Sequence, residues 1–349
     1  MKQMRQITAY VLKETLPLYL AGFSIFMVLM TTDMLASYMG WIMQFDVSFW
    51  AGFELFFLKT PQFMSMALSA AIPFAILMTF GRLARDSELK VMLSSGIRPI
   101  QLMVPMLALG ASVVPVLLWV EHQLKPMANL QHEETYYRLS GLPTRVQQEE
   151  MYTQVHKGIL YTAGSVRRQT DDLAVLKGVM VRTEHHTFTA PSGTWDVKKG
   201  TWSLYDVKQV NHNTGTWEPR ISMDFPSPAA QPNFTEKSSF IPSGPLQKRM
   251  HDPELPLAEQ RKSQMEWGRR FADPFTALSF ALAASALGLL LRDRSWAFIL
   301  VVLMVFGYYV LWIRTPALAE VGALPVWLAV WLPNGVFAAL GLAVLRRLL

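Results

Sequence analysis

Few residue patterns in this chain could support catalysis. The 349-residue sequence has none of the short motifs that bind nucleotide phosphates or catalytic zinc, activate a serine or form a redox dithiol, namely GxxxxGK[ST], HExxH, GxSxG and CxxC. All seven histidines lie within residues 121–273, and two of them, His185 and His186, are adjacent. Because neighbouring residues of a strand point to opposite faces of a sheet, this pair is poorly placed to bind one metal ion. We therefore expect no catalytic residues, no metal and no cofactor in this chain.

Residues 81–99 carry the most distinctive spacing of charged and apolar side chains. Arg82, Asp86 and Lys90 recur every four residues, a row of alternating charge that favours a helix by about 0.2 to 0.5 kcal/mol per pair. Four apolar residues at helical spacing lie in the same stretch: Leu89, Met92, Leu93 and Ile97. Gly96 predicts the end of the helix, which we place at about residues 82–97. The pattern alone fits a helix that docks on a partner, an amphipathic helix that lies on lipid, or an ordinary basic loop.

Ionisable residues near the ends of long apolar runs form a second group of candidates, made up of Asp33, Arg314 and Glu320. A charge in the middle of a bilayer costs about 2.5 to 3.5 kcal/mol, so these residues should lie at a membrane boundary or face a polar cavity. Interfacial anchoring beside tryptophans such as Trp41 and Trp312 would explain them. Contact with an amphiphilic substrate is the functional alternative.

Six apolar runs must position these residues. Each has at least 18 positions without a charge, which at about 1.5 Å per residue crosses, or nearly crosses, a hydrocarbon layer about 30 Å thick. The runs are residues 15–32, 60–81, 99–120, 274–291, 295–313 and 321–345. We predict six transmembrane helices, with a soluble core helix as the alternative for the first and fourth runs. The first run exceeds a usual signal-peptide core and no small-x-small cleavage site follows it, so we expect the N-terminus to be retained.

Lys and Arg in the short loops predict the orientation of these helices, because cytoplasmic loops carry an excess of both residues. With the N-terminus inside, eleven of them lie in the cytoplasm and only Lys59 and Arg314 lie in the short outer loops. Both termini are then cytoplasmic, and residues 121–273 lie outside. This outer segment has 19 Lys and Arg against 18 Asp and Glu, so the net charge of +6 comes almost wholly from the membrane half. Nucleic-acid binding has little support from such a distribution.

Short runs of alternating residues follow residue 141. They are rich in Val, Thr, Tyr and Trp and are separated by Gly, Asp or Asn, a pattern typical of antiparallel strands in a sandwich or open barrel. HTFTA from His186 and TWDV from Thr194 are two of these runs. We therefore predict an inserted all-β domain at residues 140–262, between an N-terminal membrane half at 1–139 and a C-terminal one at 263–349. Since the chain has no cysteine, this domain needs no disulfide.

Longer stretches combine these features in a distinctive order. The sharpest is PQFMSMALSAAIPFAILMTFGRLARDSELKVMLSSGIRPIQLMVP, with a proline-containing second span, then G-x-L, a Ser-Glu-Leu triplet and a glycine that closes the loop helix. Supporting stretches are YVLKE at Tyr10, RRFADPF at Arg269, HTFTAPSGTWDVKKGTWSLYDV at His186 and LPNGVFAALGLAVLRR at Leu332. Together they cover essentially the whole chain, which resembles the LptF/LptG (YjgP/YjgQ) permease family of the lipopolysaccharide export ABC transporter.

This resemblance implies a helical membrane bundle with an inserted periplasmic all-β jellyroll-like domain, in the inner membrane of a bacterium. The implied function is that of a permease that extracts lipopolysaccharide or a related glycolipid and passes it to periplasmic jellyroll bridge proteins. A cytoplasmic ABC ATPase dimer would hydrolyse ATP, and a paralogous LptF/LptG-type permease would pair with this chain. The chain itself would be a transporter subunit and no enzyme.

The resemblance also assigns residues by position. In this family the loop helix is the coupling helix that inserts into a groove on the ATPase. The corresponding residues here are Arg85, Glu88, Leu89, Met92 and Gly96, with Glu88 the foremost candidate. The first and fifth spans line the lipid cavity, which gives Phe26, Met30, Asp33, Tyr308, Trp312 and Arg314. Asp33 departs from members that have basic residues near this point, suited to phosphorylated lipid A, and Lys59 or Arg314 could compensate.

Two other functions stay open on the sequence. One is a mechanotransmitting ABC permease, which moves no lipid through its bundle and acts on a periplasmic partner. The other is a membrane-anchored enzyme or sensor with a β ectodomain, which would require a clustered nucleophile or a carboxylate pair.

Overall fold

The structure is a computed structural model of the 349-residue chain. It describes residues 2–45, 47–140, 148–156, 158–169, 173–196, 198–212, 214–226, 238–253, 255, 257–291 and 294–348. The chain divides into two compact units. We call Met1–His132 together with Ser238–Leu349 the helical unit, and Glu133–Lys237 the β unit.

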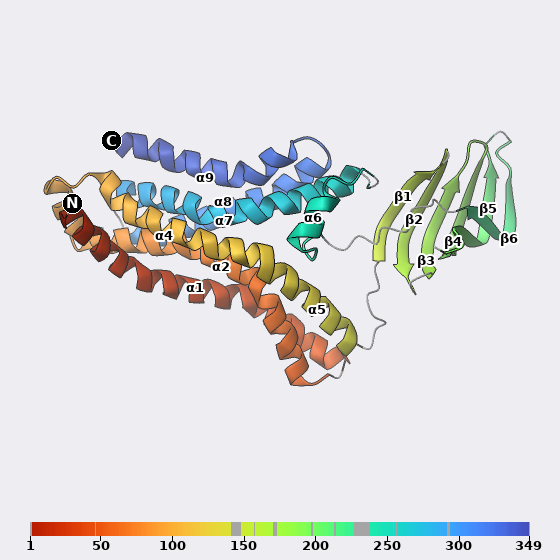
Figure 1. The fold of residues 1–349 in the computed structure, drawn as a ribbon, viewed down its shortest axis with the longest axis horizontal. Coiled ribbons are helices and arrows are strands. Elements are labelled where there is room, and N and C mark those ends of the chain that lie inside the picture. The colour runs from red at the N-terminus through yellow and green to blue at the C-terminus, as the bar shows by residue number, and fades with distance from the viewer. Residues whose placement is uncertain are drawn as a thin grey trace. The chain divides into compact units, whose positions relative to one another are not determined.

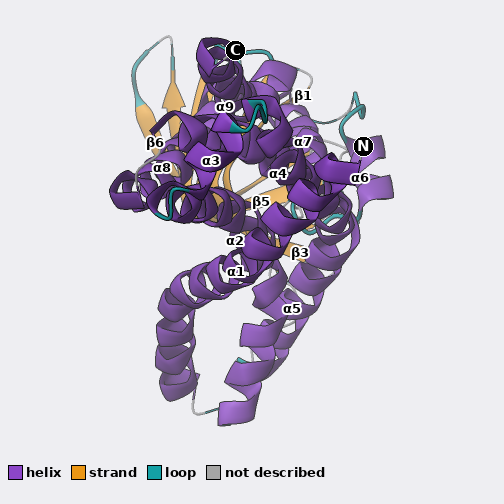
Figure 2. Ribbon diagram, turned by 90° about the vertical axis from the view of Figure 1, so that its left-hand side faces the viewer, coloured by secondary structure: helices purple, strands orange, loops and turns teal. Residues whose placement is uncertain are grey.

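Long helices make up the helical unit (Figures 1 and 2). They are α1 (Lys2–Phe45), α2 (Phe49–Arg85), α4 (Pro99–Trp119), α7 (Leu257–Leu291), α8 (Arg294–Glu320) and α9 (Val326–Leu348). The shorter elements are α3 (Glu88–Ser94), the π-helix η1 (Val120–Leu124), α5 (Lys125–Leu139) and α6 (Ser243–Arg249). α4, η1 and α5 follow one another without a break.

Among the residues that the structure describes, six helical stretches are long and apolar enough to cross a membrane, which confirms the predicted membrane bundle. They are Arg5–Gln44, Phe49–Arg85, Pro99–Leu139, Leu257–Leu291, Ala297–Glu320 and Val326–Leu348. Hydroxyl groups within them bond to the preceding turn, as when the Thr31 Oγ1 donates to the carbonyl oxygen of Met27 at 2.7 Å. Such bonds satisfy polar side chains where water is absent.

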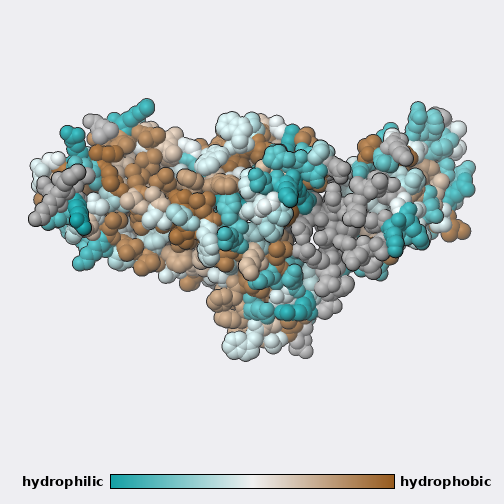
Figure 3. Space-filling model, viewed as in Figure 1, coloured by the Kyte–Doolittle hydropathy of each residue, from teal (hydrophilic) through white to brown (hydrophobic). Residues whose placement is uncertain are grey.

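Apolar side chains cover much of the helical unit's surface (Figure 3). On α1 the exposed ones include Leu16, Leu20, Ile25, Val28 and Leu29. On α8 they include Phe298, Val302, Leu303, Phe306 and Ile313. An exposed apolar surface of this extent is typical of helices that face lipid or another membrane protein.

Helix α7 packs against α2, α4 and α9. Small residues permit this close approach. A Cβ added at Gly110 of α4 would lie 2.8 Å from the Cβ of Ala281 and 3.0 Å from the carbonyl oxygen of Ala277. A Cβ at Gly288 of α7 would lie 2.8 Å from the ring of Phe80 on α2. The small residues of α7 therefore serve packing within the chain.

Beyond the end of α5, the described residues of the β unit form a six-stranded antiparallel sheet, which confirms the predicted inserted all-β domain. The strands are β1 (Gln148–His156), β2 (Ile159–Arg168), β3 (Leu173–Arg182), β4 (His186–Asp196), β5 (Thr201–Asn211) and β6 (Trp217–Pro226). Each described strand pairs with the next in chain order, as in a meander. The runs at His186 and Thr194, predicted as two strands, form the single strand β4.

One line of interrupted pairing crosses the described strands. The cross-strand register is the same on both sides of it, yet one ladder pair is missing between neighbouring strands, and two are missing between β4 and β5, namely Ala190–Val207 and Pro191–Asp206. The positions on this line in each strand, which we call the crease, are Met151, Gly164, Gly178, Pro191, Asp206 and Ile221. Proline has no N–H to donate, so Pro191 can lie within β4 only because its position needs no ladder bond.

The alternation of buried and exposed residues is interrupted at the crease, so that apolar side chains on both sides of it face the same core. In β3, Ala174 and Leu176 are buried before it and Val179 and Val181 after it, so the alternation shifts by one residue. Gly178 and Asp206 have left-handed backbones, with φ of 61° and 54°. As a result both halves of the sheet bury their apolar side chains in the same core. That core is built around aromatic residues, namely Tyr152, Tyr161, Phe188, Trp195, Trp202 and Phe225.

Candidate functional site

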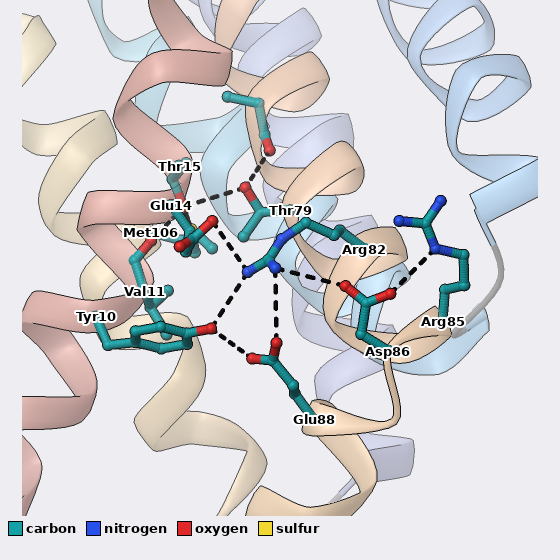
Figure 4. A network of polar contacts seen from close by, with 11 residues as sticks. Tyr10, Val11, Glu14, Thr15, Thr79, Arg82, Arg85, Asp86, Glu88 and Met106 are labelled. Carbon is teal, nitrogen blue, oxygen red and sulfur yellow. Dashed lines mark hydrogen bonds and ion pairs between the residues drawn. The ribbon is translucent and has the colours of Figure 1, made fainter.

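Charged residues gather where ends of α1, α2 and α3 lie close together (Figure 4). α2 ends at Arg85, and the chain turns before α3 begins at Glu88. Ser87, in the turn, has a φ of 58°, a left-handed conformation that interrupts an α-helix. The stretch predicted as one helix at about residues 82–97 is thus divided between the last turn of α2 and the seven-residue α3.

Arg82 is at the centre of this group. Its guanidinium lies 3.0 Å from the carboxylate of Glu14 on α1, 3.5 Å from that of Asp86 and 3.6 Å from that of Glu88. It also donates a hydrogen bond of 3.3 Å to the hydroxyl of Tyr10. Because three carboxylates surround one guanidinium, the positive charge of Arg82 is what allows these helix ends to approach one another. We call these five residues the Arg82 cluster.

Glu88 faces into the Arg82 cluster. The hydroxyl of Tyr10 donates a hydrogen bond of 2.5 Å to its Oε2, and its Oε1 is the oxygen nearest Arg82. Beside the cluster, the buried Thr79 Oγ1 of α2 donates to the Oγ1 of Thr15 on α1 at 3.2 Å (Figure 4). The residue with the foremost predicted role therefore fastens α3 to α1 and α2.

The apolar stripe of α3 faces its own unit. Leu89 is only 1% exposed and belongs to the core of the helical unit. Met92, Leu93 and Ile97 are partly buried and pack against the same core. The sequence pattern left open whether this stripe faces lipid or a partner, and the structure shows it covered by the chain itself.

The opposite face of α3 is exposed. Val91 is 61% exposed, and Lys90, Ser94 and Ser95 are exposed with it. Of the residues assigned by resemblance, Arg85 is also exposed, with its Nε 3.1 Å from Asp86.

Gly96, the last of those residues, has a φ of 86° and ends α3. Its N–H donates to the carbonyl oxygen of Leu93, and the N–H of Ile97 donates to that of Met92, both at 3.2 Å. This pair of bonds is a Schellman motif, which satisfies carbonyls at the helix end and favours glycine.

A second polar group lies inside the helical unit, around a cavity of about 60 Å³. The cavity has room for a few water molecules and none for a lipid. Its lining includes Ser65, Ser69, Glu121, Lys125, Asp273 and Tyr309. Glu121 is 3% exposed and lies 2.7 Å from the Nζ of Lys125. Within the described ranges, no three His, Asp or Glu side chains are grouped so that they could hold a metal ion.

The model of one protein family, the lipopolysaccharide export system permease LptF/LptG, matches residues 9–347. The chain belongs to this family. No individual curated protein sequence matches it significantly. As an LptF/LptG permease, the chain is a multi-pass membrane protein of lipopolysaccharide export, and a transporter component and no enzyme.

The structure places the predicted lipid-cavity residues of this LptF/LptG permease in different environments. On α1, Asp33 is exposed, Met30 is half-buried, and Phe26 packs edge-on against Phe74 of α2 with ring centroids 6.4 Å apart. On α8, Arg314 is exposed.

The two aromatic candidates on α8 face the inside of the unit. Tyr308 is buried and shares a hydrogen bond of 2.5 Å with Thr276 of α7. Trp312 donates from Nε1 to the carboxylate of Asp273 on α7 at 3.1 Å, and Arg269 of α7 lies over its ring at 3.9 Å. These two residues thus join α8 to α7.

Sequence analysis missed Glu121, Lys125 and Asp273. Glu121 and Asp273 lie next to the ends of charge-free runs and Lys125 lies five residues beyond the run 99–120, all within the segment predicted to lie outside. The signal that could have found Glu121 and Lys125 is their i, i+4 spacing, which predicts an ion pair on a helix. For Asp273, the signal is a carboxylate directly before the charge-free run 274–291, which is long enough to span a membrane.

Proposed function

We propose that this LptF/LptG permease couples a cytoplasmic ABC ATPase dimer to the extraction of lipopolysaccharide or a related glycolipid from the inner membrane. The observation that carries the proposal is the Arg82 cluster, in which Glu88 of α3 accepts a hydrogen bond from Tyr10 of α1 and pairs with Arg82 of α2 at 3.6 Å. A displacement of α3 would pass to two membrane helices, because the polar bonds and the buried Leu89 hold it against both. Large movements of this kind occur in packed elements that shift as rigid bodies.

The ATPase contact would involve the exposed face of α3. Arg85, Lys90 and Val91 would touch the ATPase, with Gly96 at the end of the contact surface. Leu89 and Met92 would anchor the helix in the bundle, and Glu88 would lock it to α1 and α2. This division of roles follows the burial of the side chains.

Lipid would enter along α1 and α8, whose exposed apolar surfaces suit acyl chains or a partner permease. The lining of this path would include Phe26, Met30, Asp33, Tyr308, Trp312 and Arg314. A paralogous LptF/LptG-type permease would complete it. The excess of Lys and Arg near the termini and near α3 supports cytoplasmic termini and a periplasmic domain at about residues 140–262. That domain would pass the lipid to periplasmic jellyroll bridge proteins.

Glu88→Ala tests the coupling. The substitution removes the acceptor of the Tyr10 hydrogen bond and one ion pair of Arg82. ATP hydrolysis should continue while lipid release per ATP falls at least about fivefold, since a hydrogen bond to a charged group contributes about 1.5 to 3 kcal/mol. Both rates are measured on the complex in proteoliposomes. Glu134→Ala, at an exposed glutamate of α5, is the matched control. Unchanged release per ATP in Glu88→Ala would count decisively against the assigned role.

Affinity purification from native membranes tests the partners and the substrate. The expected result is co-purification of an ABC ATPase and a second permease, with a glycolipid bound to the complex. A complex with an ATPase but no bound lipid would favour the mechanotransmitting function instead.

A further inference from the structure

The chain returns to the helical unit through a short segment that is held by buried polar contacts. After β6 ends at Pro226, the next described residues are Ser238 to Pro242, which lead into α6. We call Ser238 to Arg249 the return segment. Ile241 is 4% exposed and Leu246 fully buried, so the segment is part of the packed unit.

Arg270 of α7 holds this segment. Its side chain is only 1% exposed, which is rare for arginine. Nη2 donates to the carbonyl oxygens of Ile241 at 2.6 Å and Ser238 at 3.3 Å, and Nη1 donates to the Oγ of Ser243 at 2.9 Å. All three acceptors belong to the return segment. Glu266, one turn earlier on α7, lies 3.8 Å from Nε and balances the charge.

The third span holds the same segment through three contacts. The Nδ1 of His122, in η1, lies 3.0 Å from the Oγ of Ser243, and that Oγ also contacts the carbonyl oxygen of His122 at 3.3 Å. The Nδ2 of Asn129 on α5 donates to the carbonyl oxygen of Ser239 at 3.5 Å. Ser243 thus bridges η1 and α7, and η1 is a π-helical turn, an irregularity frequent at functional sites.

Arg269, the residue before Arg270, contacts α8. Its guanidinium lies over the ring of Trp312 on α8 and donates to the carbonyl oxygen of the same residue. Of these two consecutive arginines of α7, Arg269 therefore binds α8 and Arg270 binds the return segment. Cation–π stacking and a fork of several N–H donors are both properties of arginine that lysine does not reproduce.

We propose that Arg270 is a positioning residue that transmits movement of α7 and α8 to the return segment. The proposal rests on the proposed transport function. Arg270 touches no lipid in this role. Its three donors make the return segment move with α7, and Arg269 makes α7 respond to α8, one of the two helices along which lipid would enter.

Arg270→Lys tests the link in the purified permease–ATPase complex. A lysine keeps the charge but cannot reach three acceptors in a fork, so hydrogen exchange of the return segment should accelerate roughly tenfold or more, the factor expected for loss of one charge-assisted hydrogen bond. Lipid release per ATP should fall while bound lipid and ATP hydrolysis persist. Arg261→Lys is the matched control, because Arg261 also lies on α7 and donates to a backbone carbonyl, that of Glu320, outside the return segment.

A disulfide in place of the His122–Ser243 contact distinguishes the transmission of movement by Arg270 from its effect on the stability of the return segment. The chain has no cysteine, so His122→Cys with Ser243→Cys gives a single pair whose parent side chains are in contact. This disulfide ties the return segment to η1 and not to α7, so in the Arg270→Lys background its oxidation should slow exchange of the segment without restoring release per ATP. If Arg270→Lys does not fold, Ser243→Ala takes its place, assayed by exchange and by release per ATP.

Exchange and release unchanged in Arg270→Lys, or full recovery of release after oxidation of the disulfide to η1, would overturn the proposal. Failure of the transport function itself is distinguishable, because the wild-type complex would then hold no lipid and release none.

Discussion

Substitution of Arg82 is the sharpest test of how α3 is attached. Arg82→Gln keeps a polar side chain of similar reach and removes the charge, so the carboxylates of Glu14, Asp86 and Glu88 face one another without it. The three ion pairs are between about one quarter and one third exposed, so each contributes about 0.2 to 1 kcal/mol and not the larger value of a buried pair. Only the pair with Glu88 is broken when α3 opens, so its loss weakens the docking of α3 by up to about 1 kcal/mol, which is about fivefold in its opening equilibrium.

Hydrogen exchange of the α3 backbone measures that equilibrium directly. The amides of Glu88–Ser94 should exchange about fivefold faster in Arg82→Gln than in the wild type. Arg85→Gln is the control, since Arg85 is 55% exposed and reaches the cluster only through Asp86 among the described residues. It should change exchange less than about threefold, the effect of one exposed pair. If Arg82→Gln stays within that limit, or if both variants behave alike, the reasoning is wrong and the packing of Leu89 alone holds α3.

Four further substitutions test other parts of the fold. Gly96→Ala places a side chain at a φ of 86° and should lower the stability of the helical unit by about 1 kcal/mol, seen as a lower Tm. Gly110→Val would add a Cβ 2.8 Å from that of Ala281 and should cost about 1 to 3 kcal/mol in the same assay. Trp202→Ala empties a fully buried site and should cost the β unit about 3 to 5 kcal/mol, read from exchange of β5. Asp196 accepts a 2.9 Å hydrogen bond from the N–H three residues later, which lowers the pKa of its carboxyl. Asp196→Ala should therefore lower the Tm at pH 7, and the difference should vanish as the pH falls through that lowered pKa, below about 3.9.

The membrane part of the fold could be predicted because its signal is local. An uncharged run of 18 or more residues has one stable state in a bilayer, so the six runs correspond to six helices. The alternation of the outer segment likewise predicted strands. The alternation could not show that β4 continues past Pro191. A proline is tolerated there because neither β3 nor β5 forms a ladder pair with it, and the pairing of distant strands is not visible in a local pattern.

The site was harder to predict, since its geometry depends on contacts between distant residues. Spacing favoured one helix through Arg82, Asp86 and Lys90, and the first pair does form at 3.5 Å. The left-handed Ser87 then turns the chain, a conformation that no regular pattern indicates. An amphipathic stripe shows that something covers Leu89 and its neighbours, but not that the cover is the chain's own bundle. The contacts of Glu88 with Tyr10 and Arg82 span 78 and six residues, and only the second is visible as a local pattern.

The crease marks the line along which the sheet of the β unit has the fewest backbone bonds. A sheet resists bending because its ladder bonds would have to stretch, and ladder pairs are missing at the crease between all the described strands. The aromatic rings of the core pack across this line, as Tyr161 does against Trp202 and Phe188 against Phe225, with ring centroids 5.2 and 4.9 Å apart. Side-chain packing, and not backbone hydrogen bonding, therefore holds the two halves of the sheet together at the crease.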